Sequence, residues 1–195
     1  MKERKWARFV LAMKDEEKVV SALNSLWIQL LSTNRRRRGQ NKCMIGLLDI
    51  LRKSSDNEIR LAALRCIRFF SSYCGADPTR LLVDIVSSTE ECVSVRIAAL
   101  ETLSMRWIFA KRSARKHDMV VAALAKCLMD DEKLVREQAL WECRILVMNE
   151  LESEIAVFTD SSIYPRSTVR CAKNTLECFA YGGYRGSRGC SNSNA

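Results

Sequence analysis

The residues of this chain that could bind a metal or take part in covalent chemistry are nine cysteines and a single histidine, His117. A zinc site needs closely spaced thiolate or imidazole ligands, typically starting from a Cys-x-x-Cys pair. No such pair occurs, so we expect no metal site, and no cofactor motif is present either. Catalysis through Ser/His/Asp or Cys/His would have to use His117, which stands at the head of a helical stretch and is interpreted as a capping or surface residue.

Most of the cysteines fall among apolar residues in probable helices, where cysteine packs as a small hydrophobic side chain. An odd number of cysteines and a start that lacks the apolar stretch of a signal peptide favour reduced thiols and an intracellular, cytoplasmic or nuclear protein. No apolar run approaches the roughly 18 residues that a membrane span needs. We expect Cys190 to be the most exposed thiol, and the buried set to be Cys66, Cys127, Cys143, Cys171 and Cys178.

A second kind of chemistry, the binding of anions, is suggested by the distribution of charge. The chain has a formal net charge of +9, and residues 1–42 hold 11 Lys or Arg against 4 Asp or Glu. Basic runs stand at 35–38 and 111–116, and such clusters suit phosphates of RNA or DNA, an acidic protein or an anionic membrane surface. They are equally compatible with a solvated surface or a nuclear localisation signal. The basic residues expected to contact a partner or phosphate are Arg35, Arg36, Arg37, Arg38, Lys111, Arg112, Arg115 and Lys116.

The four tryptophans divide into two groups. Trp27, Trp107 and Trp141 have apolar neighbours in helical stretches, so we expect them in the core. Trp6 lies beside Lys5 and is the better candidate for an exposed anchor, since aromatic side chains dominate many interface energies.

The elements that must position these residues are revealed by an internal repeat. Residues 59–64 read IRLAAL and residues 95–100 read VRIAAL, with weaker copies in LVREQAL at 134–140 and TVRCAKNTL at 168–176. The shared arginines are Arg60, Arg96, Arg136 and Arg170. Self-similarity at steps of roughly 34 to 40 residues is the signature of a stacked repeat array.

Apolar periodicity predicts about five antiparallel helix pairs in one domain at 1–181, followed by a short Gly/Ser/Arg tail at 182–195. Small polar or acidic residues precede the second helix of each pair and suit its N-terminus. The expected pairs are 2–14 with 16–31, 41–53 with 57–73, 78–88 with 92–110, 116–129 with 132–149, and 150–159 with 166–181.

An acidic turn followed by Val-Arg and then Ala and Leu resembles the HEAT repeat of the armadillo-like proteins. The resemblance covers about 16–180 and implies an all-α, right-handed α-α superhelix. It also implies a ladder between the repeated arginines and acidic turn residues of neighbouring repeats, with the acids at Asp56, Glu90 and Asp130. The pattern departs from the family in the first unit, which lacks the arginine, and in the fifth, where SSIYP replaces an acidic turn.

The function expected from this pattern is that of a non-enzymatic scaffold or adaptor that binds a protein partner through its repeat surface. Nucleic-acid binding along a basic loop edge and a structural role in a larger assembly are the alternatives. HEAT-like iron hydroxylases need His-Glu ligand pairs, which one histidine does not supply. No motif supports a bilin lyase, and a HEAT-like DNA glycosylase would need an acid beside Trp107 or Trp141.

Overall fold

The computed structural model describes residues 16–32, 40–69, 76–109, 114–146 and 148–180. Within these ranges all regular secondary structure is helical, the helices are joined by short turns, and there is no strand. The elements are α2 (Glu16–Ser32), α3 (Gln40–Lys53), α4 (Asn57–Phe69), α5 (Thr79–Ser87), α6 (Val93–Phe109), α7 (Ala114–Leu128), α8 (Lys133–Leu146), η1 (Asn149–Leu151), α9 (Glu152–Ala156), η2 (Val157–Thr159) and α10 (Arg166–Ala180).

These helices confirm the all-α class and the pairing expected from the periodicity. Most helix ends lie within about two residues of the expected ones, a difference that is ordinary for helix termini. The exceptions are the C-terminal end of α8, which ends at Leu146 rather than at 149, and the first helix of the fifth pair, which is broken into η1, α9 and η2. The expected continuation of α4 over 70–73 lies outside the described residues. The first helix of the first pair and the tail after 181 lie outside the described residues.

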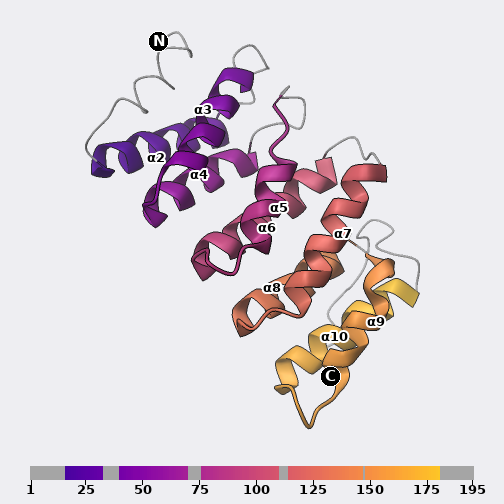
Figure 1. Ribbon diagram of the computed structural model, residues 1–195. Helices are drawn as coiled ribbons and strands as arrows, with labels where there is room; N and C mark the ends of the chain where they lie inside the picture. The colour runs from indigo at the N-terminus through magenta and orange to yellow at the C-terminus, as the bar shows by residue number, and fades with distance from the viewer. Residues whose placement is uncertain (1–15, 33–39, 70–75, 110–113, 147, 181–195) are drawn as a thin grey trace, which may run out of the picture.

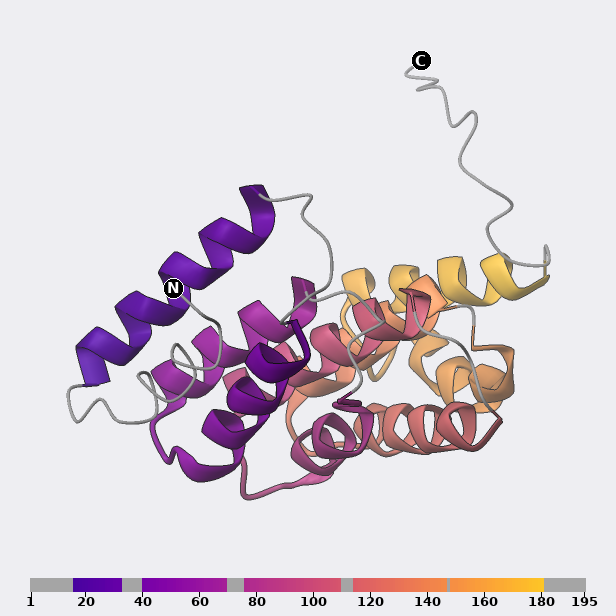
Figure 2. The same cartoon turned by 90° about the horizontal axis from the view of Figure 1, so that it is seen from above.

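The helices form two layers, as expected for a stack of helix pairs (Figure 1). The second helices α2, α4, α6, α8 and α10 pack side by side in that order, so that each contacts the next repeat's second helix. The first helices α3, α5 and α7 pack against α4, α6 and α8, respectively, and form the other layer (Figure 2). Each repeat therefore buries its apolar side against its own partner helix and against its neighbours.

The core lies between the two layers and runs through the described repeats as one cluster. The repeated alanines Ala62, Ala63 and Ala99 are buried and let the helix backbones approach closely. Leu64 and Leu100, at equivalent positions of consecutive repeats, are fully buried behind them. The IRLAAL and VRIAAL copies are thus the packing face of α4 and α6.

Acidic residues in the turns start the following helices. The Asp56 carboxylate accepts a hydrogen bond from the Ile59 N–H (2.8 Å), and the Asp77 carboxylate accepts one from the Thr79 N–H (3.1 Å). Such side-chain caps satisfy donors that have no partner inside the helix. Pro78 follows Asp77 and directly precedes α5, where its missing N–H does no harm.

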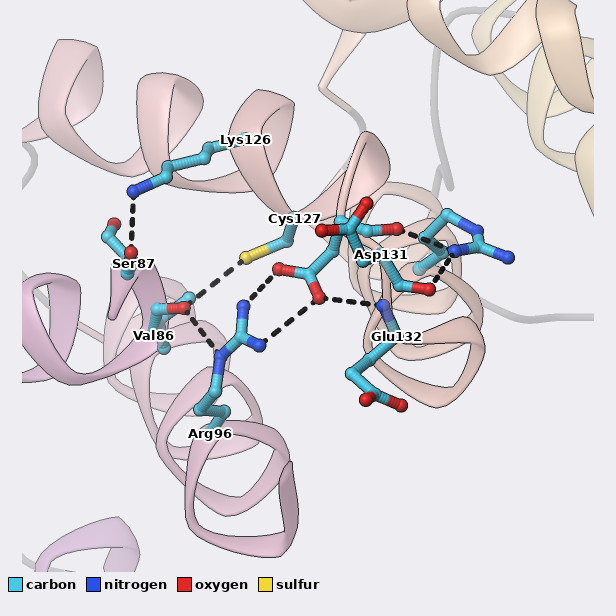
Figure 3. Close-up of polar contacts among 9 residues, drawn as sticks. Val86, Ser87, Arg96, Lys126, Cys127, Asp131 and Glu132 are labelled. Atoms are coloured by element: carbon cyan, nitrogen blue, oxygen red, sulfur yellow. Dashed lines mark hydrogen bonds and ion pairs between the residues drawn. The ribbon is translucent and has the colours of Figure 1, made fainter. Parts of the chain in front are cut away.

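The third and fourth repeats are joined by a buried ion pair between Arg96 and Asp130 (Figure 3). The Arg96 guanidinium donates to both Asp130 carboxylate oxygens, and its Nε donates to the Val86 carbonyl oxygen at 3.2 Å. The same carboxylate accepts from the Glu132 N–H (3.0 Å) in the turn that leads into α8. One pair therefore links the end of α5, the start of α6 and the start of α8.

The other repeated arginines differ in their contacts. Arg60 pairs with Glu91 of the next turn, whereas the neighbouring Glu90, the expected partner, is exposed. Arg136 instead donates to two carbonyl oxygens of its own turn, those of Asp130 (2.5 Å) and Asp131 (2.7 Å). Arg170 is exposed, and no ion pair joins it to another residue in the described ranges. The fifth repeat offers no acid to Arg136, and no described sixth repeat faces Arg170.

We expect the change Asp130→Asn to destabilise the fold by about 3–5 kcal/mol at neutral pH, because it leaves the Arg96 charge buried and unpaired. Urea unfolding followed by circular dichroism measures this loss. Asp131→Asn removes an exposed carboxylate one residue away and is the matched control, with an expected change within about 0.5 kcal/mol. Equal stability of the two variants would contradict the role given to the buried pair.

Burial opposes ionisation of Asp130, but the hydrogen bonds from Arg96 and Glu132 outweigh it and hold the pKa of this carboxyl below its usual value of 3.8. A folded-state pKa below the unfolded one adds stability that is complete above the unfolded pKa and is lost as pH falls through the folded pKa. The stability difference between wild type and Asp130→Asn should therefore narrow only below about pH 4.

The cysteines of the described residues are free thiols with contrasting surroundings. Cys66, Cys127 and Cys143 are buried, as expected, whereas Cys171 and Cys178 are half-buried. Burial raises the pKa of Cys127 to about 11 and raises that of Cys143 further. Cys92 is exposed, and hydrogen bonds from Ser94 hold the pKa of its thiol below the usual value of 9.0. Cys190 lies outside the described residues.

We expect Cys92 to react with iodoacetamide far faster than the buried Cys127 and Cys143, because the thiolate is the reactive form and must be accessible. Peptide mass spectrometry after short labelling of the native protein measures the three rates. Labelling in urea is the control and should bring the rates together. Equal native rates at Cys92 and Cys143 would contradict the burial of Cys143.

Candidate partner-binding surface

One side of the second helices points away from the layer of first helices and remains accessible. This accessible side is formed by successive helical turns of α4, α6 and α8, and these three helices are neighbours in the stack. We refer to it as the second-helix face. Its exposed or half-buried members are Leu61, Arg65, Arg68 and Phe69 of α4, Glu101, Met105 and Ile108 of α6, and Leu134, Trp141 and Ile145 of α8.

Helical spacing and the repeat together place these residues on the same side. Leu61, Arg65 and Phe69 are four residues apart, which puts them on one face of α4. The repeat steps of 36 and 40 residues then carry Phe69 onto Met105 and Ile145 at equivalent positions of α6 and α8. The second-helix face is therefore a product of the same periodicity that builds the core.

The second-helix face is rich in large apolar side chains for an accessible surface. Phe69, Ile108, Trp141 and Ile145 are each at least 40 % exposed, on three adjacent helices. Single exposed hydrophobic residues are ordinary, but a group of them on one side of a protein is typical of an interaction site. Ile28 of α2, 59 % exposed, continues the apolar character toward the N-terminal end of the stack.

Charged residues fix the geometry of this face and flank it. Arg68 of α4 and Glu101 of α6 form an ion pair at 2.8 Å that bridges the two helices. Arg144 lies over the ring of Trp141, with its guanidinium carbon 5.6 Å from the ring centroid. A cation over an aromatic face is attracted to the ring and restricts its motion. This contact favours one orientation of the half-exposed Trp141 ring.

The expectation of a buried Trp141 was wrong. Trp107 is buried at 4 % exposure, whereas Trp141 is 48 % exposed. Both have apolar neighbours in sequence, but the repeat register carries Trp141 onto the position of Glu101, on the outer side of its helix. Trp141 lies beside a hollow of about 170 Å³ between α8 and α10, which Leu140 and Cys171 also line. The side chain of Trp27 lies outside the described part of the structure.

Most of the basic residues expected to bind a partner lie outside the described residues. This holds for Arg35, Arg36, Arg37, Arg38, Lys111 and Arg112, and for the side chain of Arg115. Trp6, the expected aromatic anchor, also lies outside the described residues. Lys116 is described, and its ammonium group pairs with the Asp77 carboxylate at 2.7 Å. That carboxylate neutralises Lys116 locally and reduces its value as a phosphate contact.

His117 joins two neighbouring repeats rather than forming part of a reactive cluster. Its Nε2 lies 2.8 Å from a carboxylate oxygen of Glu150, and its ring centroid lies 5.6 Å from that of Trp107. The pKa of the Glu150 carboxyl is lowered mainly by a backbone hydrogen bond and, to a smaller extent, by the hydrogen bond with His117. Within the described residues, no group of three or more His, Cys, Asp or Glu side chains is placed to hold a metal ion.

A family model described as HEAT repeats matches residues 46–144, which is just over half of the chain. The chain belongs to the HEAT-repeat family. No curated protein matches it significantly, and neither does any solved structure. None of the helices in the described residues combines the length and the apolar character that a membrane-spanning segment requires.

HEAT repeats generally mediate interactions between proteins, and enzymatic members of the family are the exception. Sequence reasoning predicts a contact surface made of second helices and edge loops, but it assigns the contact to basic loop residues and Trp6 and does not identify the exposed apolar positions such as Ile145. The signal was present in the repeat itself, since Phe69, Met105 and Ile145 recur at one register position.

The two tryptophans should respond differently to truncation. Trp107→Ala removes a buried indole and should cost about 3–5 kcal/mol of unfolding free energy. Trp141→Ala removes a half-exposed side chain and should cost less than about 1 kcal/mol. Parallel urea titrations measure both, and a loss at Trp141 as large as that at Trp107 would contradict its exposure.

Proposed function

We propose that this protein is a non-enzymatic scaffold or adaptor that binds a protein partner through the second-helix face. Its main support is the gathering of exposed Phe69, Ile108, Trp141 and Ile145 on adjacent helices of a stack. Burial of such side chains by a partner is favourable at roughly 25 cal/mol per Å² of apolar surface removed from water.

The same face supplies specificity as well as apolar area. The ion pair between Arg68 and Glu101 and the stacked Arg144 place charges beside the apolar side chains. An aromatic residue in the middle of a contact, with charged residues near it, is the usual composition of an interface hot spot. The repeat packing holds these groups in place, so that binding requires little ordering of the chain.

The alternative of nucleic-acid binding depends on basic runs that lie mostly outside the described residues, and Lys116, the one described side chain among them, is paired. Strong dependence on salt is the property that would distinguish phosphate contacts from a mainly apolar protein contact. The test of the scaffold proposal therefore also includes a variant in which the basic run at 35–38 is changed to glutamate.

The test is a quantitative pull-down from the protein's own cells with wild-type bait, the double variant Trp141→Ala/Ile145→Ser, and Met129→Ser as a matched control. Met129 is an exposed apolar residue at the end of α7, outside the second-helix face. We expect the specific partners to fall by at least about tenfold with the double variant, because truncating central anchors costs more than 1–2 kcal/mol. The control should retain them.

Recovery of the same partners at the same level with the double variant would contradict the proposal. Recovery of nucleic acid instead, released by moderate salt and lost when Arg35 to Arg38 are changed to Glu, would replace it with phosphate binding. Circular dichroism of each bait establishes that the variants remain folded.

A further inference from the structure

The junction between the fourth and fifth repeats differs from the two junctions before it. Arg60 reaches the Glu91 carboxylate and Arg96 reaches the Asp130 carboxylate, each in the turn of the following repeat. Arg136 occupies the same register position, yet no ion pair joins it to any carboxylate in the described residues. It contacts two carbonyl oxygens of its own turn instead.

The missing partner can be traced to particular residues of the fifth turn. Asp130 stands three residues before α8, and Glu91 stands two residues before α6. The corresponding positions before α10 are Ile163 and Tyr164, and neither carries a charge. The nearest acid in the turn, Asp160, accepts hydrogen bonds from the N–H and hydroxyl of Ser162 and closes the turn itself.

The place of the missing carboxylate is a cavity of about 330 Å³ between α8 and the fifth turn. Lys133 and Arg136 line one side of it, and Phe158, Ile163, Tyr164 and Thr168 line the other. Phe158 and Tyr164 pack together with ring centroids 4.9 Å apart and form an aromatic wall. The cavity is thus apolar on one side and cationic on the other.

The charges around this cavity favour an anion. Glu137 also lines it, but its carboxylate accepts a hydrogen bond from the Thr168 hydroxyl (2.8 Å) and lies 3.8 Å from the Lys133 ammonium group. Arg166 and Arg170 are exposed on the first turns of α10 and add positive charge nearby. The positive ends of α8 and α10 both lie at this junction, and a helix N-terminus favours negative charge.

We infer that this cavity binds an aspartate or glutamate side chain of a protein partner, which supplies from outside the carboxylate that the fifth turn lacks. The inference rests on the proposed function, because it names the kind of partner residue and a second point of attachment. Arg136 and Lys133 hold the carboxylate, and the aromatic wall of Phe158 and Tyr164 packs against the flanking apolar part of the partner. The cavity and the hollow beside Trp141 share Glu137 and Thr168 as lining residues, so that one extended peptide can reach both.

The first test supplies the missing acid within the chain itself. Ile163 is 67 % exposed, so its replacement costs little packing. The melting temperature of the Ile163→Asp variant should lie about 2–4 °C above that of the matched neutral variant Ile163→Asn. Only the aspartate supplies a carboxylate to Arg136 and so completes the series of arginine–carboxylate pairs between repeats. The difference should disappear when Arg136 is also changed to Met. Equal melting temperatures of the two variants would overturn the inference, and this result does not depend on any partner.

The second test asks whether a ligand uses the cavity. A phage-displayed random dodecapeptide library is selected on the full-length wild-type protein, and recovered peptides are synthesised with each Asp or Glu changed to its amide. We expect one acid to be required, with roughly tenfold weaker binding of its amide counterpart. The same peptides should bind Ile163→Asp about tenfold more weakly than Ile163→Asn, because the internal aspartate occupies the cavity.

The outcomes separate this inference from the proposed function. Peptides that need Trp141 and Ile145 but no acid, or that bind the two Ile163 variants equally, overturn the carboxylate site and leave the second-helix face as the binding surface. Failure to recover any specific peptide also overturns the carboxylate site. The proposed function fails separately, when the pull-down partners are unaffected by changes at Trp141 and Ile145.

Discussion

The arrangement of the repeats depends on the buried pair of Arg96 and Asp130. The pair makes four hydrogen bonds at one point: two between the side chains, one to the carbonyl of Val86 and one from the N–H of Glu132. The Cys127 thiol donates to the same Val86 carbonyl. Burying two charges is costly unless they are paired and fully hydrogen bonded, and here both conditions are met. Because separation of the pair would leave two buried charges without partners, the pair disfavours any shift of the turn before α8 against α6.

The fold could be predicted from the sequence because the same pattern of packing residues recurs in consecutive repeats. The alanines at 62, 63 and 99 and the leucines at 64 and 100 identify the packing face, and the recurring arginine fixes the register. The details of the ladder could not be predicted in the same way. Glu90 and Glu91 are adjacent acids in a turn, and only the local backbone decides which of them reaches Arg60.

The candidate site was harder to predict, and the reason lies in residues such as Trp141. Apolar neighbours suggest burial, but the outer side of a second helix has no covering layer in a two-layer stack. Exposure therefore follows from the repeat register rather than from the local sequence, and Trp141 shares its register position with Glu101. The basic runs at 35–38 and 111–116 lie mostly outside the described residues, so that their contact with a partner or phosphate stays a prediction.

The most direct test of the account is site-specific photocrosslinking, because it reports contact rather than stability. A photoreactive phenylalanine analogue is placed at Ile145, on the second-helix face, or at Met129, in the turn directly after α7, and the protein is irradiated in its own cells. The account predicts a discrete crosslinked protein partner from position 145 and none from position 129. Equal crosslinking at both positions, or crosslinking at 129 alone, would contradict the assignment of the second-helix face as the binding surface.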